Sequence, residues 1–445
     1  MPQAVPRTTM LESLKFSGLY TLPALLRGGF VLNPTATRLT ERLDTNARAG
    51  RLCMRLRVRY GGRSVWVKGP TGKVLLVLSQ GDIKKALSAS DSVLSLCTKE
   101  KQRGLSVFQP DSLILSSGEL REDRHRFHEA VLEPGRLPHS LAPRLREVMA
   151  QELDGLLGHR QCELDRDRLL RGYHRAVLRF VFGDAARDDT RIMEALRALR
   201  REANWMGLRR WRASQIKAHR QTMDGAIQRY VDAADADSLV GRFTSAPHTD
   251  ATRPAGQVSH WLMALDGIGS ALLLPALAVL AGHPDQCERA RREAVQGGGG
   301  FLDACLLETA RLWPLVPTLA RTLTEPLDWH GTRLPAGTDV MIPLAVHHRN
   351  PQLDYADAFT PEAWLDGRAQ QDWWIAPFSR GPGQCPGSDL GLQAGTAALA
   401  EILRQYALSP VCPFLGPHRP LPRTLDPLSL RLRIRPLGSR DDADD

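Results

Sequence analysis

Apolar residues recur at helical spacing through most of the chain, whereas strand-like runs are few and short. A spacing of three and four residues dominates 139–232, with a break at 182–189, and it predicts successive amphipathic helices there. A further helix is expected to begin at about Asp82, whose side chain can cap it. The same spacing predicts four more helices, over 118–132, 285–295, 301–313 and 388–408.

One predicted helix is apolar almost all round. It covers residues 256–284, and a helix without a polar face is expected to run through the centre of a fold. Gly267, Gly269 and Pro275 lie inside it. Glycine weakens a helix interior and proline removes one backbone hydrogen bond, so the helix should be distorted locally.

Strands are predicted at two places only. Residues 64–68 and 73–78 read as two strands joined by a turn at 69–72, and short strand-like pieces follow at 319–324 and 338–344. The fold class expected is mainly α with small β-sheets, an α+β architecture. Without an internal repeat or a convincing linker, we expect one domain over 1–437 with a peripheral segment at 1–50, followed by a disordered acidic tail at 438–445.

Composition narrows the class of protein. Of 445 residues, 42% are hydrophobic and 24% are charged, which is ordinary for a soluble globular protein. The net charge of +10 comes mostly from arginine, and it fits either solvated helix faces or an acidic partner protein. No basic run is interleaved with aromatic residues and no zinc-finger or RNA-binding signature occurs, so nucleic acid is not an expected partner.

Cysteine spacing and the early apolar residues bear on location. The seven cysteines show no CxxC or CxxH spacing, which argues against zinc, iron–sulfur clusters and a disulfide framework and suits a reducing cytoplasm. The apolar stretch at 17–33 is interrupted by Pro23 and Arg27. It is too short to span a bilayer and lacks the features of a signal peptide, so we expect a cytoplasmic protein without a transmembrane anchor.

A single cysteine lies in an unusual loop, FSRGPGQCPG, at residues 378–387. A thiol that binds a metal must be a thiolate, and backbone N–H groups that stabilise it can approach only where side chains are absent. Glycines flank Cys385, a helix is expected to begin just after it, and Phe378 could form an apolar wall. The alternative is a glycine-rich surface loop with an incidental cysteine.

The loop resembles the haem-binding loop of cytochromes P450, F-x-x-G-x-x-x-C-x-G, at Phe378, Gly381, Cys385 and Gly387. Other elements of that family follow its order. Glu308 and Arg311 resemble the E-x-x-R pair of its K helix, and the resemblance covers about residues 55 to 410. Three more segments are similar to P450 elements: 118–131 to the C helix, 280–285 to the end of the long I helix, and 347–364 to the stretch after the K helix.

The resemblance implies a haem-thiolate oxidoreductase, and a monooxygenase in the usual case. Haem b would lie between the central I helix and the cysteine loop with its following L helix, and Cys385 would be the axial ligand and the iron-binding residue. Phe378, Gly381 and Gly387 would contact the haem, and its propionates would be bound by Arg321, Arg121 and His125. Electrons would come from NAD(P)H through a ferredoxin reductase and an acidic ferredoxin. The expected protein is a monomer that oxidises a small organic molecule, as in bacterial specialised metabolism.

The chain departs from the P450 pattern at two positions outside the I helix. Two residues before the cysteine, where the family usually has Arg or His for a propionate, stands Gly383. The arginine that usually completes a triad with the K-helix pair is replaced by Ala363. Backbone carbonyls or Arg349 are then expected to neutralise the pair.

The I helix departs further. The family's A-G-x-E/D-T motif falls on 264–268, which places Gly267 at the acid position and Ile268 at the alcohol position. Asp266 or Ser270 could supply the proton relay if the helix is distorted, or a polar group of the substrate could organise water. The chain could also use peroxide, catalyse a rearrangement, coupling or heteroatom bond formation, or bind haem without turnover. The expected substrate contacts are Ala264, Gly267, Val316 and Thr318.

Overall fold

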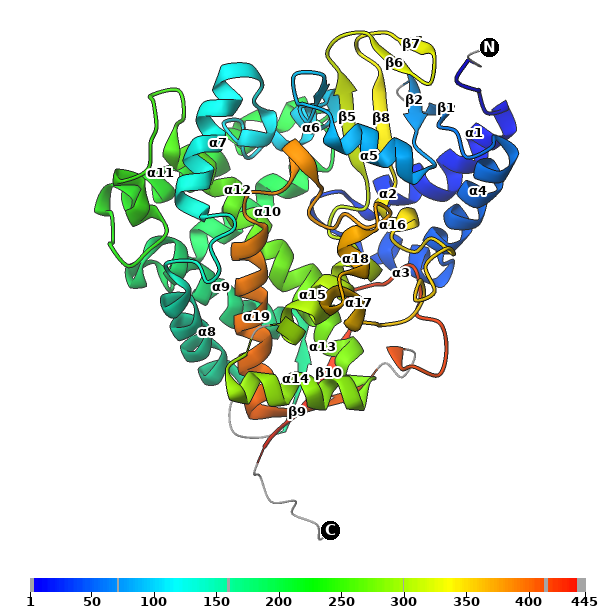
Figure 1. Cartoon of the computed structure of the whole chain (residues 1–445). Coiled ribbons are helices and arrows are strands. Elements are labelled where there is room, and N and C mark those ends of the chain that lie inside the picture. Colours follow the sequence, from blue (N-terminus) through cyan, green and yellow to red (C-terminus); the bar gives the residue numbers. More distant parts are fainter. Residues whose placement is uncertain (1–3, 70–71, 158–160, 299, 412–414, 438–445) are drawn as a thin grey trace.

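Helices form most of the protein and small sheets lie at its margins, as the apolar spacing predicts (Figure 1). The computed structural model describes residues 4–69, 72–157, 161–298, 300–411 and 415–437, and the predicted acidic tail lies outside these residues. The helices of the first half are α1 (Met10–Phe16), α2 (Leu22–Arg27), α3 (Pro34–Arg42), α4 (Thr45–Arg59), α5 (Gln80–Ser88), α6 (Lys99–Leu105), α7 (Gly118–Leu132), α8 (Ala142–Leu157), α9 (Arg166–Phe182), α10 (Thr190–Ala203) and α11 (Ala213–Ala233). Those of the second half are α12 (Pro254–Gly267), α13 (Leu274–Ala281), α14 (Pro284–Gln296), α15 (Gly300–Leu312), α16 (Leu344–His347), α17 (Glu362–Leu365), α18 (Arg368–Gln371) and α19 (Ser388–Gln405).

The largest sheet is mixed and has the strand order β1-β2-β8-β5-β3. The predicted pair is present as β1 (Val65–Gly69) and β2 (Gly72–Leu76), antiparallel with Val65 opposite Leu76. The pieces expected after residue 318 are β5 (Leu319–Leu323) and β8 (Asp339–Ile342), and β3 (Leu94–Ser95) completes the edge. β8 pairs with β2 in parallel, so the sheet joins the two regions of the chain in which strands were predicted.

Two smaller sheets were not predicted. β4 (Cys162–Asp165) and β9 (Tyr406–Pro410) both pair with β10 (Arg431–Pro436), so this sheet joins segments that are distant in the sequence. β6 (Leu327–Trp329) and β7 (Thr332–Leu334) form a hairpin. The helix expected to begin at Asp82 begins at Gln80 instead. Its cap is Ser79, whose hydroxyl accepts from the Asp82 N–H, while the Asp82 carboxylate accepts from the Ser64 hydroxyl at 2.6 Å.

The apolar helix predicted at 256–284 is α12 and α13 joined without a break by a π-helical segment, Ile268–Leu273. Pro275 is the second residue after this segment, and its missing N–H cannot bond the carbonyl one turn earlier, which explains the predicted distortion. By length and composition, residues 254–281 could cross a membrane, but 72% of their most apolar window is buried inside the protein. Leu272, Leu277 and Val279 are among the fully buried side chains.

The N-terminal segment is anchored to the largest sheet by two aromatic residues. Phe16 and Tyr20 are buried in one hydrophobic cluster with residues of β1 and β2. The Tyr20 hydroxyl donates to the Pro317 carbonyl at 2.8 Å and lies 2.7 Å from the Thr318 hydroxyl. The segment therefore supports the loop that follows α15.

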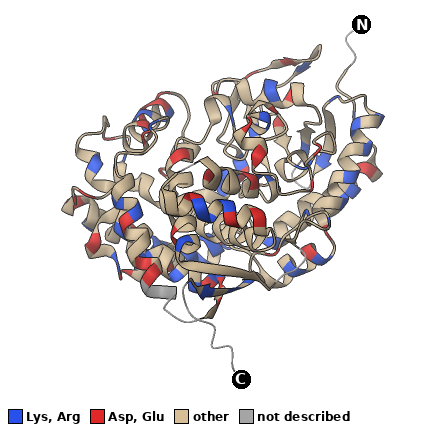
Figure 2. Cartoon of the chain, turned by 60° about the horizontal axis from the view of Figure 1, so that its bottom comes forward, with Lys and Arg blue, Asp and Glu red and all other residues tan. Residues whose placement is uncertain are grey.

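Arginine-rich helices expose their charges, as one of the two interpretations of the net charge requires. In α10, Ile192, Leu196 and Leu199 are buried while Arg197 and Arg201 are exposed. Figure 2 shows Lys and Arg interspersed with Asp and Glu along the outer helices. Much of the positive charge is thus a solvated helix face.

Candidate functional site

The cysteine loop is held by backbone hydrogen bonds just before α19. The N–H of Cys385 donates to the Phe378 carbonyl at 2.9 Å, and the Cys385 carbonyl accepts from Ser388 at 3.2 Å. Gly381 has a φ of +62°, and a Cβ there would lie 2.4 Å from the carbonyl oxygen of Leu87. The loop can therefore pack against the end of α5 only with glycine at this position.

The sulfur of Cys385 has one donor from the chain itself. Burial raises the pKa of the Cys385 thiol, whereas the backbone N–H of Gly387 hydrogen-bonds to it and lowers the pKa in part. A coordinated metal cation deprotonates a thiol outright. Cys385 and Phe378 are both half-buried, so the thiol is sheltered without being sealed in the core.

The two outer glycines of the loop should respond differently to substitution. Gly381→Ala places a Cβ against backbone at a positive φ, and we expect it to lower the free energy of unfolding by about 2 kcal/mol or more. Gly387 has a φ of −98°, and its added Cβ would meet only Leu132 at 3.5 Å. Gly387→Ala should therefore cost less than about 1 kcal/mol. Urea unfolding followed by circular dichroism compares the two, and equal losses would contradict this account of the loop.

Three cationic side chains gather on the sheet side of the loop. Arg321 on β5 and Arg121 on α7 are buried, and Lys101 on α6 is half-buried. Arg121 pairs with Asp91 at 3.2 Å, while Lys101 donates to the carbonyls of Leu96 and Ala320 at 2.7 and 3.1 Å. Three cations beside one carboxylate leave two uncompensated positive charges at this place.

The pKa shifts express the cost of this cluster. Burial lowers the pKa of Lys101 to about 7, and the charges of Arg321 and Arg121 contribute to this shift. Cys97 and Asp91 act in the opposite direction. Burial also lowers the pKa of Arg321 to about 10. Buried positive charges that outnumber the carboxylates beside them destabilise a fold, so their presence favours an anionic ligand. The two carboxylates of a haem would fit this donor set.

Gly383 is explained by the same cluster. A Cβ at Gly383 would lie 2.8 Å from Nη2 of Arg321, which donates to the Ser379 hydroxyl at 3.1 Å. The guanidinium of Arg321 thus occupies the space where a side chain at 383 would begin. His125 is not drawn into the cluster by any described contact, because its Nδ1 faces Glu129 at 3.4 Å one turn along α7.

Removing the ammonium of Lys101 should stabilise the haem-free chain. Its pKa is lower in the folded state than the ordinary 10.5, so the unfolded chain binds the proton more tightly. The cost to the fold is complete below the folded pKa and shrinks as the pH rises toward 10.5. We expect Lys101→Met to be more stable than the parent in urea at about pH 6, with a smaller gain at about pH 9. An equal gain at both pH values would contradict the assignment, and haem retention should fall in the variant.

One face of α12 and the π-helical segment is less buried than the rest of the helix. Ala264 is exposed and Gly267 and Ser270 are half-buried, although the helix runs through the core. A Cβ at Gly267 would lie 3.3 Å from the Leu315 side chain. The loop after α15 therefore borders the same face. Two of the predicted substrate contacts lie on this loop. Val316 is 50% exposed, while the Thr318 hydroxyl lies within hydrogen-bond distance of the Tyr20 hydroxyl.

Asp266 lies on another side of the helix. His174 on α9 is 2.8 Å from one of its carboxylate oxygens, and Arg200 on α10 is 2.5 Å from the other. Burial alone would raise the pKa of Asp266, but the hydrogen bond from His174 and the charge of Arg200 hold that pKa well below its usual range. The carboxylate is thus fixed between helices. Ile268 packs against α19, where its side chain lies within 3.5 Å of the Cβ positions of Gly391 and Gly395.

The K-helix pair is fully buried and closely bonded. Arg311 donates to both oxygens of Glu308 at 2.7 Å. It also donates to four backbone carbonyls, those of His348, Tyr355, Ala356 and Ala358. Glu308 accepts in addition from the Thr360 N–H and from the indole of Trp364. Trp364 and the backbone thus complete the pair where the family's arginine is replaced by Ala363.

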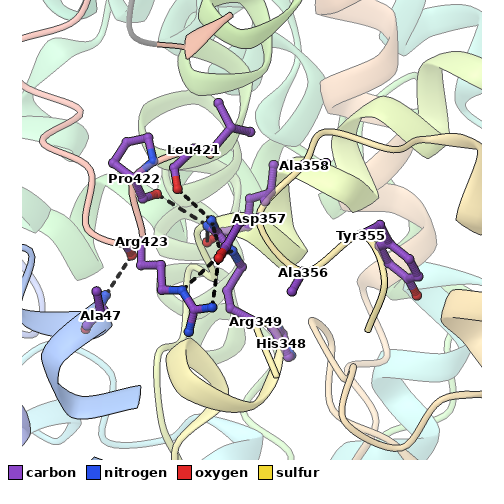
Figure 3. A network of polar contacts seen from close by, with 12 residues as sticks. Ala47, His348, Arg349, Tyr355, Ala356, Asp357, Ala358, Leu421, Pro422 and Arg423 are labelled. Atoms are coloured by element: carbon purple, nitrogen blue, oxygen red, sulfur yellow. Dashed lines mark hydrogen bonds and ion pairs between the residues drawn. The ribbon is translucent and has the colours of Figure 1, made fainter. Parts of the chain in front are cut away.

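Arg349 does not neutralise this pair, contrary to one of the two expectations. It binds Asp357 at 2.7 Å and donates to the carbonyls of Leu421 and Pro422 (Figure 3). Arg423 binds both oxygens of the same Asp357 at 2.9 Å. These contacts tie the segment after α16 to the region that precedes β10.

Sequence reasoning missed Lys101 and Asp91. Both lie in polar stretches whose pattern is typical of exposed loops and short helices, and neither belongs to a motif. A lysine in a short polar helix carries no signal by itself, and only the fold brings it to Arg321. Trp364 was quoted in the 347–364 segment, but its role appears only once Ala363 is seen beside Glu308.

Comparison with known proteins finds similarity in the second half of the chain. A sequence model of the cytochrome P450 family matches residues 273–426. The chain is 34% identical over 131 residues to cytochrome P450 137 of Mycobacterium tuberculosis, covering 29% of this chain and 27% of that protein. It is 37% identical over 162 residues to cytochrome P450 734A5 of Oryza sativa subsp. japonica, covering 32% and 30% of the two chains. The matched part thus spans less than a third of these relatives.

Proposed function

We propose that this chain, whose residues 273–426 match the cytochrome P450 family, is a haem-thiolate oxidoreductase that oxidises a small organic molecule. The observation that carries the proposal is the loop in which Cys385 receives the Gly387 N–H beside the cation cluster. Haem with a thiolate ligand supplies electron-transfer and oxygen chemistry when bound. Cys385 would bind the iron, and Lys101, Arg121 and Arg321 would hold the two carboxylates of the haem.

The residues above the haem would bind and orient the substrate. Ala264 and Gly267 lie on the less buried face of α12, which the Leu315 side chain borders, so they would contact an apolar part of the substrate and exclude water. Proton delivery would not come from Asp266, whose two oxygens are bound by His174 and Arg200. The hydroxyl of Ser270 lies on the same face and makes no described side-chain hydrogen bond, so it is the group that could hold a proton or a water there.

We further propose that electrons reach the protein from NAD(P)H through an acidic ferredoxin, as the resemblance implies and the net charge of +10 supports. A cytoplasmic role in specialised metabolism is consistent with the cysteine pattern. The second candidate is a peroxide-using enzyme or a P450 that forms a bond without inserting oxygen. It is favoured by Gly267 and Ile268 at the acid and alcohol positions, because neither side chain can relay a proton.

The test compares two ways of driving the haem-loaded protein. A ligand library is first screened by the spin-state shift of the haem absorbance, and the binders are then incubated either with NADPH, ferredoxin reductase and ferredoxin or with hydrogen peroxide. The proposal expects an oxidised product from the ferredoxin system, with a lower rate in Ser270→Ala than in the parent. Product from peroxide alone supports the second candidate. Binding without product in either system contradicts both.

A further inference from the structure

His260 is a polar side chain on the less buried face of α12. It lies four residues before Ala264 and seven before Gly267, so the three positions are aligned along one side of the helix. His260 is half-buried, so part of the residue is accessible on the same face as Ala264. The neighbouring positions on this face, Met263 and Gly267, are apolar.

The hydrogen bond to Gln109 determines which ring nitrogen of His260 carries the proton. Nδ1 lies 3.1 Å from Oε1 of Gln109 in this orientation of the amide, and because a carbonyl oxygen only accepts, Nδ1 donates in this arrangement. Burial lowers the pKa of His260 to about 4, so the ring is neutral at pH 7. Nε2 is then a bare acceptor, and it makes no hydrogen bond among the described residues.

Gln109 is held firmly in place. It is fully buried, and its N–H donates to the Leu105 carbonyl at 2.9 Å. One turn before His260, Gln257 binds the same loop, because its amide donates to Asp111 at 2.6 Å and accepts from Leu113 at 3.1 Å. The amide nitrogen of Gln109 is buried without a partner in the described chain. An unpaired buried donor costs about 1–3 kcal/mol, so this orientation of the Gln109 amide is favourable only when a further group accepts from its nitrogen.

We propose that Nε2 of His260 accepts a hydrogen bond from an O–H or N–H group of the substrate and that Gln109 is the positioning residue that keeps this nitrogen unprotonated. The proposal deepens the function proposed above and rests on it. Seven residues of helix separate His260 from Gly267, a rise of about 10 Å. The substrate class is therefore an elongated, mainly apolar, uncharged molecule whose hydroxyl or N–H lies about 10 Å from the part that contacts Gly267.

The same geometry selects against anions. A carboxylate offers only acceptors, and facing the bare Nε2 it would leave two acceptors unpaired in an apolar space. A methyl ether in place of the hydroxyl would likewise lose the hydrogen bond. Each such loss corresponds to about 1 kcal/mol, or roughly a fivefold to tenfold change in dissociation constant.

The test uses rigid phenols of increasing length, namely phenol, 4-hydroxybiphenyl and 4-hydroxyterphenyl, each with its methyl ether. Dissociation constants are measured on the haem-loaded protein by the spin-state shift and by isothermal titration calorimetry. We expect at least one phenol to bind about fivefold or more tightly than its ether in the parent protein. In His260→Phe this ratio should fall to about one, while the band of the reduced carbon monoxide complex is kept.

The role of Gln109 has its own readout. Two-bond proton–nitrogen spectra of the imidazole rings report the tautomer, and His260→Phe assigns the signal. We expect Nδ1–H for His260 in the parent and a mixture of tautomers in Gln109→Leu, which a merely structural role would not produce. A phenol preference unchanged in His260→Phe, no preference or no binding across the series, or Nε2–H in the parent would overturn the inference. Loss of the carbon monoxide band in the parent would instead contradict the proposed function.

Discussion

Cys385→Ala is expected to abolish the absorbance band near about 450 nm of the reduced carbon monoxide complex, because that band requires a thiolate on the iron. The loop itself should survive the change. Its hydrogen bonds run through the backbone, from the Cys385 N–H to Phe378 and from Ser388 to the Cys385 carbonyl, and alanine keeps both. The cation cluster is also untouched, so the variant should still take up some haem, without the thiolate spectrum.

Cys162→Ala is the matched control for this experiment. Cys162 is another half-buried cysteine, but it lies on β4, in the sheet formed with β10 and far along the chain from the loop. The control should keep the band, and circular dichroism should show the same helix content in both variants. A full band in Cys385→Ala, or its loss in Cys162→Ala, would contradict the assignment of the axial ligand.

Arg311→Leu is expected to lower the free energy of unfolding by about 4 kcal/mol or more, the largest loss of stability that we predict for a single substitution. The change leaves Glu308 charged and fully buried, with only Thr360 and Trp364 as donors. It also removes the partner of four carbonyls between His348 and Ala358. Folded domains are stable by about 5–15 kcal/mol, so much of the variant should be recovered unfolded or aggregated.

Arg289→Ala provides the control for a salt bridge of a different kind. Arg289 pairs with Glu362 at 3.1 Å, but both side chains are more than 40% exposed. Such pairs contribute about 0–1 kcal/mol, so urea unfolding should barely change. Glu308→Gln, which keeps the shape of the buried pair and removes one charge, should again cost several times the control. Similar midpoints for Arg311→Leu, Glu308→Gln and Arg289→Ala would show that the buried pair does not hold this region.

Local patterns carried most of the secondary structure. Helix α7 matches the predicted 118–132, and the long apolar helix was recognised together with its distortion, because amphipathic spacing and the backbone chemistry of glycine and proline act over a few residues. The predicted capping residue of α5 was wrong because Ser79 and Asp82 are both good caps. The carboxylate of Asp82 instead accepts a hydrogen bond from the buried hydroxyl of Ser64. Strands β4 and β10 were missed because a short strand gains its stability from a partner strand that the local sequence pattern does not contain.

The residues of the candidate site also divide into those that a local motif identifies and those that only the fold brings together. Cys385, Gly381 and the Glu308–Arg311 pair could be named because each belongs to a motif of short span. Lys101, Gln109 and His260 could not, since their roles arise from contacts between elements that are distant in the sequence. Asp266 shows the limit most clearly. Its proximity to the motif made it a candidate relay, whereas its direction on the helix places it between His174 and Arg200.

The most direct test of thiolate ligation is X-ray absorption at the iron of the purified, haem-loaded protein. Four porphyrin nitrogens and one sulfur scatterer at bonding distance are expected, and the sulfur should disappear in Cys385→Ala. A first coordination shell of nitrogen and oxygen alone in the parent protein, or a sulfur signal that persists in the variant, would contradict the assignment of Cys385.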